Sequence, residues 1–243
     1  MSYILVPHQN FCAQINFSCD EQLSQYELRK AFSTDTKEYA LIPSTSRIYF
    51  SYPQINPGTQ ALVLWTENYT ATPVVQSSTE EDFETIINMN AGGIYGLNKK
   101  LIIYSNQGSN YYRINPTGVD LRLKNLSFGR LYSLPSDFRL EIQSTTHKYE
   151  LSKVYFNLLG QTKYDGFANQ GLRKSYTLEF NFITEAEKQN LIQVFTLGKG
   201  CLPMWLIEDL NNSESWIFGI FRGLTYMEPY AGYFNVSISI QEL

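Results

Sequence analysis

Residue types that bind metal ions are few in this sequence. His8, Cys12 and Cys19 lie near one another and could be drawn as a zinc site, whereas the other histidine, His147, is far along the chain. A zinc site needs three or four nitrogen, sulfur or oxygen ligands that converge, usually in close pairs. The spacing here does not supply such pairs, so we interpret this group as a small buried thiol and a loop histidine. We predict no metal ion and no cofactor.

Residue types for covalent catalysis are present, but no motif assembles them. The sequence has no Gly-x-Ser-x-Gly or similar elbow that would place a base within reach of a nucleophile. The glycine-rich segment 92–96 lacks a following Lys-Ser/Thr, and it follows a predicted helix, whereas a phosphate loop connects a strand to a helix. We interpret this segment as a helix exit.

Paired carboxylates could in principle hydrolyse a glycosidic bond. Four acidic residues stand beside aromatic ones, namely Glu67, Glu179, Glu208 and Asp209. Nothing selects a pair, because Glu179 falls on the polar face of a predicted strand and the last two on a predicted hairpin. Three tryptophans could form a sugar-stacking platform or pack in the core or between subunits, namely Trp65, Trp205 and Trp216. We predict that the chain is not an enzyme.

The composition favours a folded, β-rich chain. Hydrophobic residues make up 43% of the 243 residues and charged residues 17%, so apolar surface is sufficient to offset the entropy cost of folding. The 18 Tyr and 15 Phe suit half-buried strands, and Tyr is also common at protein interfaces.

Charge and cysteine content restrict the partners and the compartment. The net charge is −4 and no run of Lys and Arg exceeds two residues, so we expect no specific nucleic-acid binding. Three cysteines, an odd and sparse set, favour reduced thiols in a protein assembled in the cytoplasm. The sequence shows no secretion signal and no apolar run long enough to span a bilayer, so we expect no membrane association.

The clearest elements lie after residue 173. Residues 174–183 and 233–243 alternate apolar and polar side chains, which predicts two half-buried strands. Their apolar faces carry Tyr176, Leu178, Phe180 and Phe182 in the first, and Phe234, Val236, Ile238 and Ile240 in the second. Segments 203–209 and 214–223 flank a turn-rich loop and predict a hairpin.

A helix is predicted over residues 185–197. Thr184-Glu185-Ala186-Glu187 matches the capping box, in which a hydroxyl and a carboxylate each satisfy an unpaired backbone N–H. Leu191 and Phe195 fall in one apolar stripe, Lys188 lies elsewhere on the helical wheel, and the glycines that follow end the helix.

The first half of the chain predicts several short strands separated by turns, which suggests a sandwich or barrel. The candidate strands are 46–51, 60–66, 101–104, 111–114 and 119–123. Helices are predicted over 78–89, where acidic residues would meet the positive end of the helix dipole, and over 21–32. A polar, turn-like region at 133–146 separates two expected β domains, residues 1–140 with one or two short helices and residues 141–243.

Residues 171–209 carry a family resemblance. Their order is Arg173 leading an alternating strand, the Thr-x-x-Glu cap, a helix, a Gly-x-Gly exit, and a strand with Pro203, Trp205 and a terminal Asp209. This order resembles the minor tail protein M and distal tail protein group of long-tailed phages, and the resemblance covers about residues 150–243. The chain departs from the related tip protein that holds an iron–sulfur cluster, because its cysteines are too few for four thiolate ligands.

The resemblance implies a tail-tube-like β fold in a structural virion protein. Such a protein forms a ring, hexameric in that family, at the distal end of the tail tube and connects the tube to the baseplate hub or tail tip. The implied partners are further copies of the chain, the tail tube protein and the hub or tip protein, and the implied location is the virion tail, assembled in the host cytoplasm.

Polar strand faces suit a hydrated surface in such a ring. We expect them to border the channel or to hydrogen-bond between neighbouring subunits. The candidate residues are Ser175, Thr177, Glu179, Asn181, Asn235, Ser237 and Ser239, together with Trp205. The aromatic content leaves open a β-sandwich module for carbohydrate binding or host recognition, and a hydrolase is a third alternative.

Overall fold

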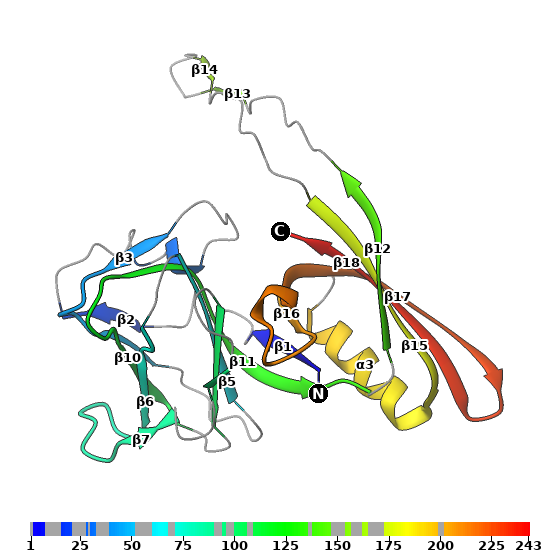
Figure 1. Cartoon of the computed structure of the whole chain (residues 1–243), viewed down its shortest axis with the longest axis horizontal. Helices are drawn as coiled ribbons and strands as arrows, with labels where there is room; N and C mark the ends of the chain where they lie inside the picture. The colour runs from blue at the N-terminus through cyan, green and yellow to red at the C-terminus, as the bar shows by residue number, and fades with distance from the viewer. Residues whose placement is uncertain are drawn as a thin grey trace.

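A computed structural model describes residues 2–7, 16–20, 28, 30–32, 39–51, 60–67, 71–89, 94–95, 100–105, 109–135, 138–146, 154–156, 162–164, 173–198 and 202–243. The chain is mostly β, as predicted, with two main antiparallel sheets and one short α-helix, and the sheets do not form a closed barrel (Figure 1).

The larger sheet runs through most of the molecule. Its strands, in spatial order, are β12 (Phe138–Thr146), β15 (Arg173–Thr184), β18 (Tyr233–Glu242), β17 (Ile217–Tyr230), β16 (Pro203–Ile207), β1 (Tyr3–Pro7), β11 (Leu121–Ser133), β5 (Gln60–Thr66), β9 (Lys100–Ser105) and β8 (Ile94–Tyr95), with β3 (Ala40–Ile42) also paired to β11. Strand β11 links the two halves, because it pairs with β5 and then with β1. At Gly129 a Cβ atom would collide with the carbonyl oxygen of Val6, so glycine permits this close strand crossing.

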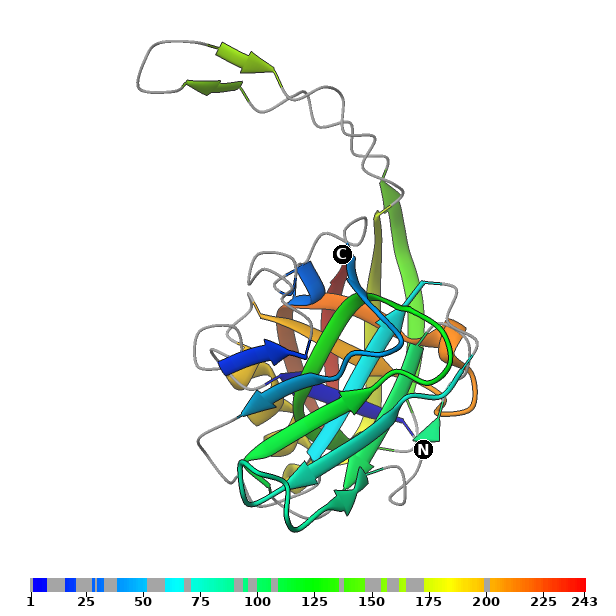
Figure 2. The same ribbon diagram turned by 90° about the vertical axis from the view of Figure 1, so that its left-hand side faces the viewer.

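The smaller sheet has the order β2 (Asn16–Cys19), β4 (Ile48–Ser51), β10 (Tyr111–Asn115), β6 (Val74–Ser78) and β7 (Ile87–Asn88). Its inner face packs against β5, β9 and β11 through a core that includes Phe50, Tyr112 and Phe128. The remaining elements are η1 (Lys30–Phe32), which contacts β11, η3 (Ser213–Ser215), which contacts β9, and the paired strands β13 (Val154–Phe156) and β14 (Thr162–Tyr164). Of these, only β13 and β14 lie away from both sheets (Figure 2).

The α-helix α3 (Glu185–Gly198) forms where the sequence predicts it. The capping box is present: the backbone N–H of Thr184 donates to Glu187 Oε2 at 2.8 Å, and the N–H of Glu187 donates to Thr184 Oγ1 at 3.4 Å. Buried side chains of the helix, such as Leu191 and Val194, pack on β15, β17 and β18. Lys188, predicted to lie off the apolar stripe, is also buried.

The predicted helix at 78–89 is wrong. Strand β6 ends at Ser78, a turn follows, and β7 takes residues 87–88. Side-chain oxygens of Ser78 and Asp82 accept the N–H groups of Glu80 and Glu84, so local hydrogen bonds compete with the helical ones. Phe83 has a φ of 59°, outside the helical region. Of the segment 92–96, interpreted as a helix exit, the structure describes residues 94–95, which form β8.

Some of the remaining sequence predictions fall on described residues, and others fall outside them. The predicted strands at 46–51, 60–66, 101–104, 111–114, 119–123, 174–183, 203–209, 214–223 and 233–243 all contain observed strands. The region 133–146 is not turn-like as a whole, because residues 138–146 form β12, and the expected domain cut at residue 140 falls inside that strand. Most of the predicted helix 21–32, and His8, Cys12, His147 and Cys201, lie outside the described residues.

Candidate functional site

Strands β15, β18 and β17 form a two-sided sheet. One face carries Leu178, Phe180, Val236 and Ile238, which are buried under α3. The opposite face is polar and is not covered by any described residue of α3. This division follows from the period-two alternation of β15 and β18.

The predicted polar residues come together on this second face. Cross-strand register places Thr177 opposite Ser239 and Glu179 opposite Ser237. Among the candidates, Asn181 and Ser239 are exposed, and the others are half-buried, namely Ser175, Thr177, Glu179, Asn235 and Ser237. The structure therefore gathers all seven on one surface, which we call the polar face.

Trp205 is not part of this surface, contrary to expectation. Its side chain is 0% exposed, and its Nε1 donates to Ser127 Oγ at 3.0 Å inside the core. The sequence pattern could not show this burial, because β16 lies between β1 and β17 and is covered on both faces. Trp216 is also buried and Trp65 half-buried, so the three tryptophans do not form an exposed sugar platform.

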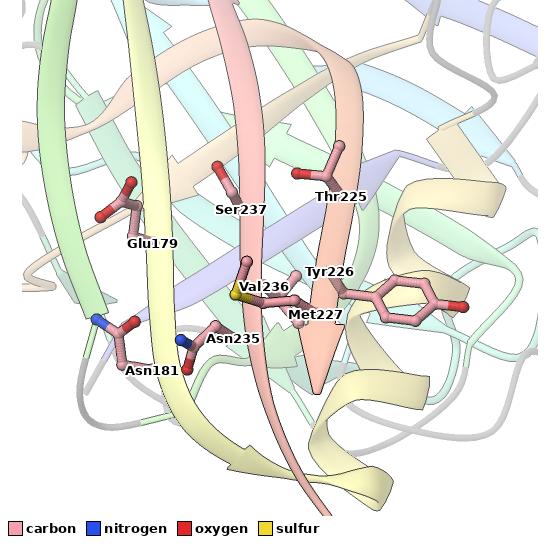
Figure 3. A pocket seen from close by; sticks show the side chains of 8 residues that line it. All are labelled: Glu179, Asn181, Thr225, Tyr226, Met227, Asn235, Val236 and Ser237. Carbon is pink, nitrogen blue, oxygen red and sulfur yellow. The ribbon is translucent and has the colours of Figure 1, made fainter. Parts of the chain in front are cut away.

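A shallow hollow lies on the polar face near the end of β17 (Figure 3). It has a volume of about 300 Å³ and is lined by Glu179, Asn181, Thr225, Tyr226, Met227, Asn235, Val236 and Ser237. The figure shows the ring of Tyr226 turned toward α3 and Glu179 standing on β15. Glu179 is the only charged side chain that lines the hollow.

A β-bulge in β15 alters the end of this surface. The register with β18 shifts between Phe180 and Ile183, so Ile183 takes the buried position that the alternation predicted for Phe182. Phe182 has a φ of 56°, and its N–H donates to Asn235 Oδ1 at 3.0 Å. Its ring faces outward and stacks on Tyr230, with centroids 6.0 Å apart and planes at 25°.

Four exposed apolar side chains gather beyond this bulge. Their exposed fractions are 57% for Phe182, 63% for Met227, 66% for Tyr230 and 51% for Tyr233. We call these four residues the aromatic tip, because they surround the turn between β17 and β18. An exposed apolar cluster of this kind usually marks an interaction site. This cluster was not predicted from the sequence, although the segment MEPYAGY shows apolar residues at a turn.

Two strand edges beside the polar face are open. Strand β17 pairs with β16 only through residues 217–220, so residues 221–230 have β18 on one side and no described strand on the other. At the opposite side of the same group, β12 pairs with β15 and with no other described strand. Unpaired N–H and C=O groups along such edges are sites where another chain can add a strand.

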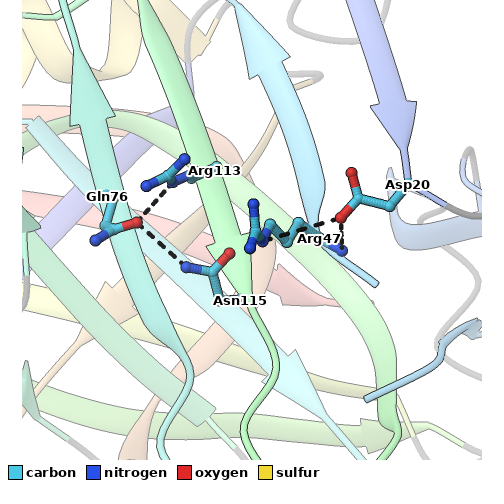
Figure 4. Close-up of polar contacts among 5 residues, drawn as sticks. All are labelled: Asp20, Arg47, Gln76, Arg113 and Asn115. Atoms are coloured by element: carbon cyan, nitrogen blue, oxygen red, sulfur yellow. Dashed lines mark hydrogen bonds and ion pairs between the residues drawn. The ribbon is translucent and has the colours of Figure 1, made fainter. Parts of the chain in front are cut away.

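A second polar surface covers the outer face of the smaller sheet, and its hydrogen bonds are largely internal (Figure 4). Gln76 Oε1 accepts from Arg113 Nε at 2.6 Å and from Asn115 Nδ2 at 3.2 Å, and Asp20 pairs with Arg47. These contacts cross adjacent strands and hold the sheet together. We interpret this surface as structural.

Among the described residues, no group of three His, Cys, Asp or Glu side chains could hold a metal ion. Glu67 forms ion pairs with Arg122 and Lys124, and Asp209 Oδ1 accepts the N–H of Asn211 in the β16–β17 turn. In the described part of the chain, no helix is both long enough and apolar enough to cross a membrane.

The chain matches no protein-family model, no curated protein and no solved structure.

Proposed function

We propose that this chain is a structural subunit of a phage tail that assembles into a ring, hexameric as in the family it resembles, at the distal end of the tail tube. The ring would connect the tube to the baseplate hub or tail tip. The single observation that carries the proposal is the pair of open edges, β12 and residues 221–230 of β17, on opposite sides of one four-stranded group.

The strand directions fit such an assembly. Strands β12, β15, β18 and β17 are antiparallel in succession, so β12 and β17 run in opposite directions. Suppose that neighbouring copies are related by a rotation about an axis parallel to the strands. Strand β12 of one copy then lies antiparallel to β17 of the next copy, as neighbouring strands within each copy already do. The contact is head-to-tail, and a rotation that closes gives a ring. Closure would also remove both open edges.

The two faces then have distinct positions. Because α3 covers the apolar face, the helix would lie outside the ring and the polar face inside. The polar face carries Glu179 as its only charged member among the seven candidates, so it would border a hydrated channel that does not grip a polyanion. Ser175, Thr177 and their neighbours on the polar face would then border the channel.

Mass measurement of the purified chain tests the proposal, followed by negative-stain imaging. We expect a mass that is a multiple of 28.0 kDa and ring-shaped particles. Thr225→Lys, at the open edge of β17, should weaken assembly because a charged edge opposes strand addition. Ser239→Lys, on the same face of the central strand β18, is the matched control and should still assemble. A strictly monomeric protein at high concentration would refute the proposal.

A carbohydrate-binding module is the second candidate, favoured by the hollow on the polar face, where the carboxylate of Glu179 and the amides of Asn181 and Asn235 line one depression. Carboxylate and amide groups placed together in a concave site can fix a small ligand by hydrogen bonds. A glycan array distinguishes the two candidates, since a ring subunit should retain little sugar.

A further inference from the structure

The aromatic tip extends beyond the part of β17 with which β12 of a neighbouring copy would pair. Cross-strand register sets Phe138, Phe180, Val236 and Tyr226 in one row across the four strands. Strand β12 begins at this row, while β17 and β18 continue beyond it to their turn. A neighbouring β12 bound in the same row therefore leaves the aromatic tip uncovered, at the end of the ring and not between its subunits.

The tip is held in one conformation by local hydrogen bonds. Gly232, at the turn with a φ of 80°, donates its N–H to Glu228 Oε1 at 2.8 Å. Asn235 holds the N–H of Phe182, whose left-handed backbone costs on the order of 1 kcal/mol. Strain retained in order to turn an aromatic ring into solvent is typical of a functional surface.

The charges around the tip have one sign. Glu228, two residues before Tyr230, carries an exposed carboxylate, and Glu179 lies in the adjoining hollow, whereas Glu185 at the start of α3 is paired with Lys188. Across residues 175–198 and 223–243 the one cation is Lys188, which is buried. A partner with basic groups around an apolar contact complements this arrangement.

A second copy does not complement it. Two tips placed against each other would oppose Glu228 to Glu228, and like charges disfavour such a contact. The other exposed large apolar residues of the described chain are Tyr226, whose ring is turned toward α3, and Leu41, Ile86 and Val119, which stand on separate elements. No described surface of this chain therefore offers an apolar patch that could receive the tip.

We infer that the aromatic tip binds a different protein stacked along the ring axis, one that presents an apolar surface rimmed by Lys or Arg. This inference rests on the proposed ring, and it assigns the axial contact to Phe182, Met227, Tyr230 and Tyr233. The open strand edges make the lateral contact and the tip makes the axial one.

Site-specific photo-crosslinking in assembled tails tests the inference. A benzophenone amino acid replaces Tyr230 in one sample and Arg139, an exposed residue of β12, in the other. We expect position 139 to crosslink to another copy of this chain. We expect position 230 to crosslink to a different polypeptide, at a peptide that contains apolar residues and Lys or Arg. Glu228→Gln, which removes the charge and keeps an oxygen that can accept the N–H of Gly232, should lower the yield from position 230 several-fold and leave that from position 139 unchanged.

The outcomes separate the two proposals. Crosslinks from position 230 to this same chain, to an acidic peptide or to nothing, with self-crosslinks retained at position 139, overturn the axial contact and leave the ring intact. Absence of self-crosslinks at position 139, in a protein that is also monomeric by mass, overturns the ring itself. Thermal unfolding of each variant confirms that the exposed substitutions leave the fold unchanged.

Discussion

The ammonium nitrogen of Lys188 lies 3.6 Å from the centroid of the Phe234 ring, so a cation on α3 rests directly on β18. The same nitrogen is 2.7 Å from Glu185 Oε2 and 4.9 Å from the centroid of Tyr226 on β17. Only 7% of Lys188 is exposed. The charge is thus paired and enclosed, and it ties the helix to both strands of the hairpin that carries the aromatic tip.

Removing this charge should destabilise the fold. We expect Lys188→Met, which keeps an apolar stem, to lower the free energy of unfolding by about 1 kcal/mol, because a desolvated cation–π contact contributes up to ~2 kcal/mol. Gln193→Met, an exposed change on the same helix, is the control and should have little effect. Urea denaturation measures both. A Lys188→Met protein more stable than the parent would show that burial of the charge costs more than its contacts return.

The hydrogen bond from Trp205 to Ser127 is buried, and Ser127 Oγ in turn donates to Asn125 Oδ1 at 2.6 Å. Ser127→Ala leaves the indole N–H without this acceptor, and we expect a loss of about 2 kcal/mol in the free energy of unfolding. Ser239→Ala, on an exposed hydroxyl, should change little. Neither variant should alter the assembled mass. A change in mass with Ser127→Ala would revive a subunit contact for Trp205.

Features set by nearby residues could be predicted from the sequence. Helix α3 and its Thr184–Glu187 cap depend on residues three apart, and strands β15 and β18 follow from their own alternation. The polar face could be predicted for the same reason. The prediction of a helix over 78–89 was wrong because acidic residues at its start are equally compatible with a turn. That turn places the Phe83 ring against Arg113, whose Cζ atom lies 4.7 Å from the ring centroid.

Features set by strand pairing could not be predicted. The outward turn of Phe182 depends on a register shift against β18, and the burial of Trp205 depends on which strands flank β16. The open edges of β12 and β17 likewise exist only once the strand order is known. The burial of Lys188 is a different case: Lys188 lies three residues before Leu191 and seven before Phe195, so helical spacing places it on the apolar stripe, and the prediction of a position elsewhere on the wheel was wrong.

Alkaline pH should weaken the fold partly through Tyr176. Burial, followed by the nearby Glu242 carboxylate, raises the pKa of Tyr176 to about 12, and its hydroxyl donates to Glu242 Oε2 at 3.1 Å. In the unfolded chain tyrosine ionises near pH 10. Between about pH 10 and 12 the unfolded chain loses this proton first, so stability falls with rising pH.

Tyr176→Phe should therefore reduce the fall in stability across that range, as measured by urea denaturation between pH 8 and 12. Some fall should persist, because burial also raises the pKa of Tyr112. Tyr230→Phe, on an exposed ring, is the control and should leave the slope unchanged. An identical slope for Tyr176→Phe and the parent chain would contradict the prediction.

Phe182 should show a trade between stability and binding. Phe182→Gly removes about 1 kcal/mol of backbone strain and loses about 0.5 kcal/mol of stacking on Tyr230, so we expect a small net gain in stability. Asn181→Gly, at a residue without a positive φ, should instead lose about 0.5–1 kcal/mol. The Phe182→Gly protein should form rings with a weakened axial contact. A loss of stability in this variant would show that the left-handed backbone is not strained.

Engineered disulfides should capture the lateral contact and fix its register. Within one chain, Arg139 on β12 and Thr225 on β17 lie in the same cross-strand row, with β15 and β18 between them. Their Cα atoms are therefore three strand spacings apart, which is about 14 Å. A disulfide needs Cα atoms within about 7 Å, so a bond between cysteines at these positions must join two copies.

In a background with Cys12, Cys19 and Cys201 replaced by Ser, Arg139→Cys is combined with Thr225→Cys, Gly223→Cys or Met227→Cys, because a closing sheet can shift its register by two residues. We expect one combination to give a ladder of covalent oligomers on a non-reducing gel that collapses on reduction. Arg139→Cys with Ser239→Cys, on the central strand, should give none. Equal yields from all four combinations would mean that random collisions, and not strand addition between β12 and β17, join the chains.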